Sequence, residues 1–148
     1  MSLRMPAWRT ALVVAWLPLV ACSRNQASEE STAKAVKVEP IAGDDVNRLI
    51  LTEEAARRLD IQTVGVRRSA INGVMRKLVP YAAILYDAEG QAWTYTNPEP
   101  FIYIRTRVTV ESVTGDLAVL STGPNPGESV VTVGAAELFG SEEEFEEE

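Results

Sequence analysis

The sequence predicts a mainly β protein, a small antiparallel β-roll or barrel-like domain with one short α-helix near residues 53–59. Three observations predict this class. Apolar and polar residues alternate along several short segments, as in strands that bury one face. Turn residues separate these segments at intervals of about 8–12 residues, which is typical of all-β rolls and barrels. A single segment combines the start and stop signals of a helix.

The predicted helix follows a short strand. Residues 47–51, NRLIL, favour a strand, and Thr52 is a good N-cap for the segment EEAARRL at 53–59. Glutamates occupy its first turn and arginines its last turn, which matches the helix dipole. The next segment, IQTVGVR, alternates between its two faces and predicts another strand.

Two hairpins are expected after this strand. Asn72-Gly73 is a turn signal between two extended segments. The clearer hairpin joins YAAILY to QAWTYT through the loop DAEG, in which Gly90 supplies the positive φ that such a loop needs.

The longest predicted strand is FIYIRTRVTVESV, which begins at Phe101. Its alternation predicts an inward face made of Ile102, Ile104, Val108 and Val110. The outward face would carry Tyr103, Arg105, Arg107 and Glu111. Two further strands, LAVLST and SVVTVG, flank the loop GPNPGE, and AAELFG is compatible with one helical turn.

The two ends of the chain differ from residues 46–140, which we expect to form the folded β-roll domain. Residues 1–21 combine a basic start, a short apolar run and small residues at the exit, the pattern of a secretory signal peptide. Residues 22–45 are rich in Ser, Ala, Glu and Lys and predict a flexible tether. Residues 141–148, SEEEFEEE, predict an acidic disordered tail, because adjacent like charges repel.

The composition argues against most catalytic and nucleic-acid functions. The net charge is −7 and the chain has no histidine. The negative charge disfavours nucleic acid and electrostatic adhesion to anionic lipid, and the lack of histidine removes the commonest general base. Two functional interpretations are still possible, a catalytic carboxylate pair at Asp87 and Glu89 and a ligand-stacking face at Trp93 and Tyr95. Turn formation explains the first pair better, and core packing explains the second. We predict no enzymatic activity, no metal site and no cofactor.

The only cysteine, Cys22, directly follows the apolar run. The residues LVAC at 19–22 resemble the lipobox of bacterial lipoproteins. This resemblance implies that Cys22 becomes the mature N-terminus and carries diacylglycerol and palmitate, which anchors an exported protein on the periplasmic side of the envelope. Ser23 in place of Asp favours the outer membrane in a Gram-negative cell. The alternative is an ordinary signal peptide with a chance cysteine near its cleavage site.

Three segments cover most of the chain from Leu49 to Gly140: LTEEAARRLDIQTVGV, VPYAAILYDAEGQAWTYT, and the closing stretch RTRVTVESVTGDLAVLSTGPNPGESVVTVGAAELFG. In this order they resemble the periplasmic adaptor, or membrane-fusion, subunits of RND-type efflux pumps. The resemblance implies a stand-alone membrane-proximal domain. It would lack the lipoyl, helical-hairpin and barrel domains of complete adaptors, because only residues 67–78 separate the first two segments.

Together these features predict a lipid-anchored, non-enzymatic envelope protein that contacts an RND-type transporter or its full adaptor and so acts in transmembrane efflux. The predicted partner contacts are the outward-facing side chains Tyr103, Arg105 and Arg107. The alternative is a lipoprotein that binds a small ligand or cation by itself, without a pump. A third class is a hydrolase that uses carboxylates.

Overall fold

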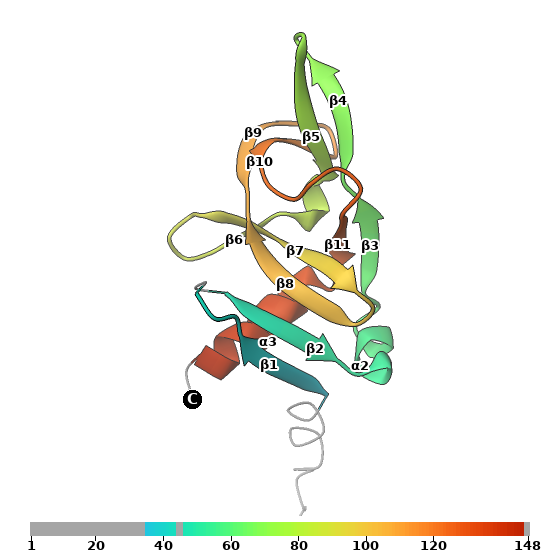
Figure 1. Cartoon of the computed structure of the whole chain (residues 1–148), viewed down its shortest axis with the longest axis vertical. Helices are drawn as coiled ribbons and strands as arrows, with labels where there is room; N and C mark the ends of the chain where they lie inside the picture. The colour runs from blue at the N-terminus through green and yellow to red at the C-terminus, as the bar shows by residue number, and fades with distance from the viewer. Residues whose placement is uncertain (1–34, 44–45, 147–148) are drawn as a thin grey trace, which may run out of the picture.

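The structure of the chain is a computed structural model, which describes residues 35–43 and 46–146. These residues form two antiparallel sheets with helices against the larger one, so the predicted mainly β class is confirmed, although neither sheet closes into a barrel. The larger sheet and the helices lie at the end of the molecule where the described chain begins and ends, and the smaller sheet lies toward the opposite end (Figure 1).

The larger sheet has seven strands, in the order β1-β2-β8-β7-β11-β3 with β6 paired to β7. Its strands are β1 (Val36–Pro40), β2 (Asn47–Leu51), β3 (Gln62–Gly65), β6 (Leu85–Tyr86), β7 (Ala92–Glu99), β8 (Ile102–Arg107) and β11 (Ser129–Val133). The smaller sheet, in the order β4-β5-β10-β9, consists of β4 (Arg67–Ile71), β5 (Val74–Pro80), β9 (Thr109–Thr114) and β10 (Leu117–Thr122). The helical elements are α2 (Glu53–Arg58), the 3-10 turn η1 (Tyr81–Ala83) and α3 (Ala135–Glu146).

The local start and turn signals are confirmed. Thr52 caps α2, because its Oγ1 accepts the backbone N–H of Ala55 at 3.1 Å. Asn72 and Gly73 connect β4 and β5 with φ values of 50° and 80°, as the two-residue turn of a tight hairpin requires. The hairpin of β6 and β7 also forms, and Gly90 in its loop has a φ of 78°.

The predicted tether at 22–45 is wrong over Val36–Pro40, where the chain forms β1. This strand pairs with β2 along its whole length. Val36 and Val38 pack against the core on the helix side of the larger sheet. The charged residues that alternate with them, Lys37 and Glu39, lie on the other face, as in a strand with one buried face. The remainder of the predicted tether before residue 35 lies outside the described residues.

The predicted acidic tail at 141–148 is wrong over its described part, because α3 continues through it to Glu146. Ala135, Leu138 and Glu142 are all buried, and their spacing of three and four residues places them on one face of a helix. This face contacts β1, β2 and β11, and Figure 1 shows α3 lying behind the larger sheet. The run of acids therefore folds because one of its carboxylates finds buried partners.

The predicted long strand from residue 101 to 113 is divided at Val108. Before this residue the chain forms β8 of the larger sheet, and after it β9 of the smaller sheet. Val108 itself is buried, and its N–H donates to the carbonyl oxygen of Ala92 at 2.9 Å. The chain thus passes from one sheet to the other at a residue that packs into the core.

Two buried clusters form the core. The first lies between the larger sheet and the helices and is built chiefly from Leu49, Leu51, Tyr95, Tyr103, Val131 and Leu138. The second lies where the two sheets meet and is built chiefly from Val66, Val79, Val108, Ala118, Leu120 and Val130. Both faces of β11 are therefore used, since adjacent residues Val130 and Val131 belong to different clusters.

Candidate functional site

Only one of the three predicted contact residues lies on the surface. Arg107 is exposed, whereas Tyr103 and Arg105 are buried, with 4% and 9% of their surface exposed. The prediction that these side chains face outward is therefore wrong for Tyr103 and Arg105. The reason is α3, which covers the sheet face that carries them, while Ile102 and Ile104 are half-buried on the other face.

Glu142 is the centre of a buried polar network beneath α3, with 0% of its surface exposed. The Nε of Arg105 lies 3.4 Å from Glu142 Oε2, and the Tyr95 hydroxyl donates to the same oxygen at 2.5 Å. The backbone N–H and side-chain amide of Asn47 donate to Oε1 at 3.3 and 3.2 Å. Glu143 brings a second carboxylate to 3.8 Å from Arg105 Nη1. These contacts offset the cost of burying the charges and hold α3 against the sheet.

Trp93 contacts two arginines at the margin of this network. The guanidinium carbons of Arg105 and Arg107 are 4.8 and 5.0 Å from the centre of its ring, within the range of a cation–π interaction. The indole N–H donates to Asp87 at 2.7 Å, and the same carboxylate accepts the Gln91 N–H at 2.7 Å. The hydrogen bond from Trp93 holds the pKa of Asp87 below its usual value. Asp87 thus organises the loop between β6 and β7.

Tyr95 is expected to lose its proton only when the protein unfolds. Burial, together with the nearby Glu142 carboxylate, raises the pKa of Tyr95 far above its ordinary value of 10.0. The unfolded chain releases this proton above about pH 10, whereas the folded chain keeps it. The contribution to stability is therefore complete below about pH 10 and is lost as the pH rises further, by about 1.4 kcal/mol per pH unit.

Urea unfolding of the wild type and of Tyr95→Phe at about pH 8 to 11 tests this expectation. The difference in unfolding free energy between the two proteins should shrink as the pH rises above about 10, because phenylalanine has no proton to release. Burial also raises the pKa of Tyr103, but that residue is present in both proteins and cancels in the comparison. A difference in unfolding free energy that stays constant with pH would show that folding does not raise the pKa of Tyr95.

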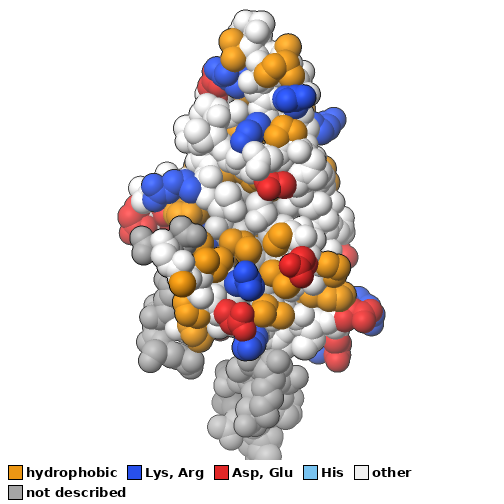
Figure 2. Space-filling view, viewed as in Figure 1, with side chains coloured by type: hydrophobic (Ala, Val, Ile, Leu, Met, Phe, Trp, Pro, Cys, Tyr) orange, Lys and Arg blue, Asp and Glu red, His pale blue; other side chains and the backbone are white. Residues whose placement is uncertain are grey.

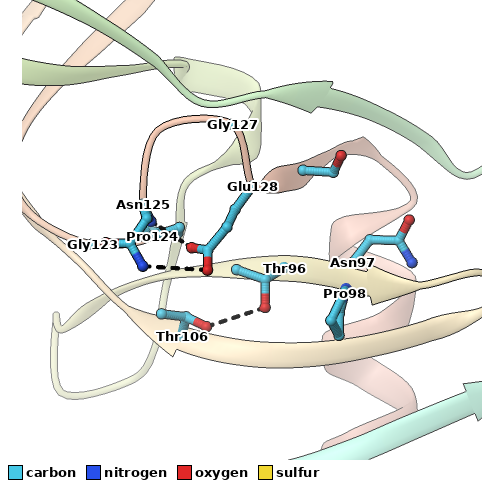
Figure 3. Close-up of a pocket in the computed structure, with 10 residues that line it drawn as sticks. Thr96, Asn97, Pro98, Thr106, Gly123, Pro124, Asn125, Gly127 and Glu128 are labelled. Carbon is cyan, nitrogen blue, oxygen red and sulfur yellow. Dashed lines mark hydrogen bonds between the residues drawn. The ribbon is translucent and has the colours of Figure 1, made fainter.

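A polar groove lies on the opposite face of the larger sheet, with a volume of about 640 Å³ (Figure 3). Its floor comes from β7 and β8, where the hydroxyl oxygens of Thr96 and Thr106 are 3.4 Å apart. One wall of the groove is the loop 123–128 between β10 and β11. In this loop the Glu128 carboxylate accepts the backbone N–H of Asn125. Hydroxyl, amide and carboxylate groups thus face one space, which suits a hydrogen-bonding ligand.

Sequence reasoning missed both Glu142 and this groove. No local pattern distinguishes Glu142 from the acids beside it, and the groove forms from segments that are distant in the sequence. The open stacking face considered for Trp93 and Tyr95 is wrong, because 9% and 0% of their surfaces are exposed. The sequence did indicate that these two aromatics share one face of a strand. In the structure Tyr95 on that face packs in the cluster that contains Leu138 of α3, and Arg107 lies over Trp93.

The prediction for Cys22 stays a prediction, because this residue lies outside the described residues. Across 35–43 and 46–146, no helix has the length and apolar character needed to cross a bilayer. In the same residues no three His, Cys, Asp or Glu side chains gather closely enough to hold a metal ion.

Comparison with known proteins gives no match to this chain, whether with family models, with curated sequences or with solved structures.

Proposed function

We propose that this protein is a lipid-anchored, non-enzymatic module of the bacterial envelope that contacts an RND-type efflux transporter or its full adaptor. Cys22 carries the lipid, and the folded domain makes the contact. The proposal combines the lipobox-like residues 19–22 with the resemblance of the three longer segments to adaptor subunits. A tethered domain acts at a raised local concentration, so that even a weak contact with the transporter is useful.

One observation supports the proposal most. The three segments that resemble adaptors are separated in the chain by residues 67–78 and 97–104, and they supply neighbouring strands of one sheet. The first provides β3, the second β7 and the third β11, and β11 pairs with both β3 and β7. An adaptor's membrane-proximal domain is expected to combine the two ends of its chain in this way. The resemblance therefore falls on one folded unit and not on unconnected fragments.

Arg107 is the contact residue that we retain. It is exposed at the end of β8, and its guanidinium stacks on Trp93. An arginine held in place by an aromatic ring loses little freedom on binding, and arginine is enriched among the residues that dominate protein interfaces. Tyr103 and Arg105 support this site from below the surface and do not touch a partner directly.

Photo-crosslinking in intact envelopes tests the proposal. A photoreactive amino acid is placed at Arg107 and, as a control, at Arg58, which is exposed on α2. We expect an adduct with an RND-type transporter or full adaptor from position 107 and none from position 58. Cys22→Ser in the same protein should reduce the adduct at least about tenfold, because tethering raises effective concentration by orders of magnitude. Equal adducts from both positions, or an adduct that is unaffected by Cys22→Ser, would contradict the proposal.

The polar groove favours a second candidate function, the binding of a small polar ligand without a pump. Its hydroxyl and amide groups are arranged around about 640 Å³, enough for a small molecule. Thr106→Val removes one hydroxyl from the groove at nearly constant side-chain volume. It should weaken the binding of such a ligand without changing the crosslink from position 107. A screen of sugars and short peptides by thermal shift separates the two functions, because ligand binding raises the melting temperature of the isolated protein.

A further inference from the structure

The hairpin of β4 and β5 projects beyond the rest of the smaller sheet. The pairing of β5 with β10 ends at Lys77, whereas the pairing of β5 with β4 continues for three more rungs to Ile71 opposite Val74. Figure 1 shows this ribbon at the end of the molecule farthest from β1 and α3. A two-stranded ribbon in water gains little stability by itself, so that an exposed one is a natural place for a contact.

The tip of this hairpin is apolar on both of its faces. Ile71 and Val74 form one cross-strand pair, and Ala70 and Met75 form the next pair, which points to the other face. All four side chains are exposed, Val74 by 48% and Met75 by 54%. A flat protein surface would cover only one of these faces, whereas a lipid layer surrounds an inserted ribbon and covers both.

Basic side chains lie directly below the apolar tip. Residues 66–80 hold four basic residues and no acid. Arg76 pairs with Glu111, and Lys77 donates to the carbonyl oxygen of Gly123 at 2.5 Å. Arg67 and Arg68 are exposed, and as neighbours in a strand they point to opposite faces. Each face of the ribbon thus has an arginine that can reach a phosphate beside the apolar tip.

We propose that this tip inserts into the interfacial layer of a phospholipid bilayer that contains anionic lipid, with Arg67 and Arg68 on the headgroup phosphates. The two apolar rungs span about 7 Å along the strands, at about 3.3 Å per residue, which fits the depth of about 5–10 Å at which interfacial segments lie. The polar turn at Asn72 and Gly73 keeps the hairpin in the hydrated layer, because its backbone groups need hydrogen-bond partners.

The net charge of −7 does not oppose this orientation, because the charges are unevenly distributed. The acids of α3 lie at the opposite end of the molecule from the hairpin (Figure 1). Figure 2 shows apolar and basic side chains at the end formed by the hairpin, with an acidic side chain beside the basic ones. Screening limits the repulsion between the distant acids and the lipid to about 8–10 Å at physiological salt, so the local charge of the hairpin governs the encounter.

A fluorescent label at the tip tests the proposal in the full chain. Cys22→Ser removes the only native thiol, and Val74→Cys then carries an environment-sensitive dye, with Glu89→Cys in the β6–β7 loop as the control position. Vesicles are made of phosphatidylcholine alone or of equal parts phosphatidylcholine and phosphatidylglycerol. We expect a blue shift at position 74, and quenching by spin labels placed near the headgroups, in the phosphatidylglycerol vesicles only. The label at position 89 should not respond.

Charge variants separate specific insertion from simple adsorption. Arg67→Gln with Arg68→Gln should weaken the response in phosphatidylglycerol vesicles about tenfold or more, while Arg57→Gln with Arg58→Gln on α2 should leave it unchanged. Equal responses in both vesicle types, or an equal loss from both pairs of variants, would overturn the proposal. So would a silent label at position 74 together with a crosslink from that position to an envelope protein. The vesicles contain no transporter, so this inference and the proposed function stand or fall separately.

Discussion

Replacing Glu142 with alanine is expected to lower the free energy of unfolding by about 3–5 kcal/mol, the usual cost of breaking a buried ion pair. The substitution would remove the closer of the two carboxylates beside the buried Arg105, and with it the acceptor for Tyr95 and Asn47. Helix α3 carries this carboxylate, and its loosening would expose Leu138 and the sheet beneath it. Urea unfolding, followed by tryptophan fluorescence, measures the loss.

Two controls define the role of this carboxylate. Glu144→Ala removes an exposed acid from the same helix and should change stability by no more than about 0.5 kcal/mol. The double variant Glu142→Leu with Arg105→Met should recover most of the loss, because removing both members of a buried pair costs much less than removing one. If Glu142→Ala and Glu144→Ala had equal effects, the network beneath α3 would not hold the helix.

The elements that the sequence predicted well are those with strong local signals. The cap at Thr52 and the turn at Asn72 depend on residues only a few positions away, and the structure confirms both. The hairpin of β6 and β7 is a further case, since its loop is short and contains Gly90. In each case the interaction that decides the backbone conformation is contained in the same short stretch of chain.

Predictions that needed a distant partner were the ones that failed. The alternation in β8 indicated two faces correctly, but it did not indicate which face is covered. Arginine on one face suggested solvent, whereas Arg105 is buried because Glu142 on α3 neutralises it. The same pairing explains why α3 was not predicted. The buried face of this helix continues from Ala135 and Leu138 to Glu142, and a carboxylate at that position interrupts the apolar pattern by which a helix is recognised. The two errors have one physical cause.

The candidate site was predictable to a similar extent. Arg107 was expected outside and is exposed, because it lies at the end of β8 beyond the cover of α3. The floor and wall of the polar groove come from β7, β8 and the loop 123–128, whose approach depends on the order of the strands in the larger sheet. That order is not readable from one sequence, since turn signals give the ends of strands and not their neighbours.

Val108→Asp is expected to unfold the domain or to destabilise it by several kcal/mol, because an isolated carboxylate in an apolar core is not compensated. Val108 is 4% exposed and belongs to the cluster in which the two sheets meet. A cost of this size approaches the whole stability of a typical small domain, about 5–15 kcal/mol. The chain also passes from the larger sheet to the smaller sheet at this residue. Disrupted packing around residue 108 would therefore separate the two sheets.

Ser112→Asp introduces the same side chain four residues further on, at an exposed position of β9, and should change stability by about 0.5 kcal/mol or less. Circular dichroism and urea unfolding of the two variants measure the difference. Equal losses would mean that Val108 is not part of the core that joins the sheets. A large loss from Val108→Asp alone would show that the position where the chain leaves β8 and enters β9 is essential for packing the two sheets together.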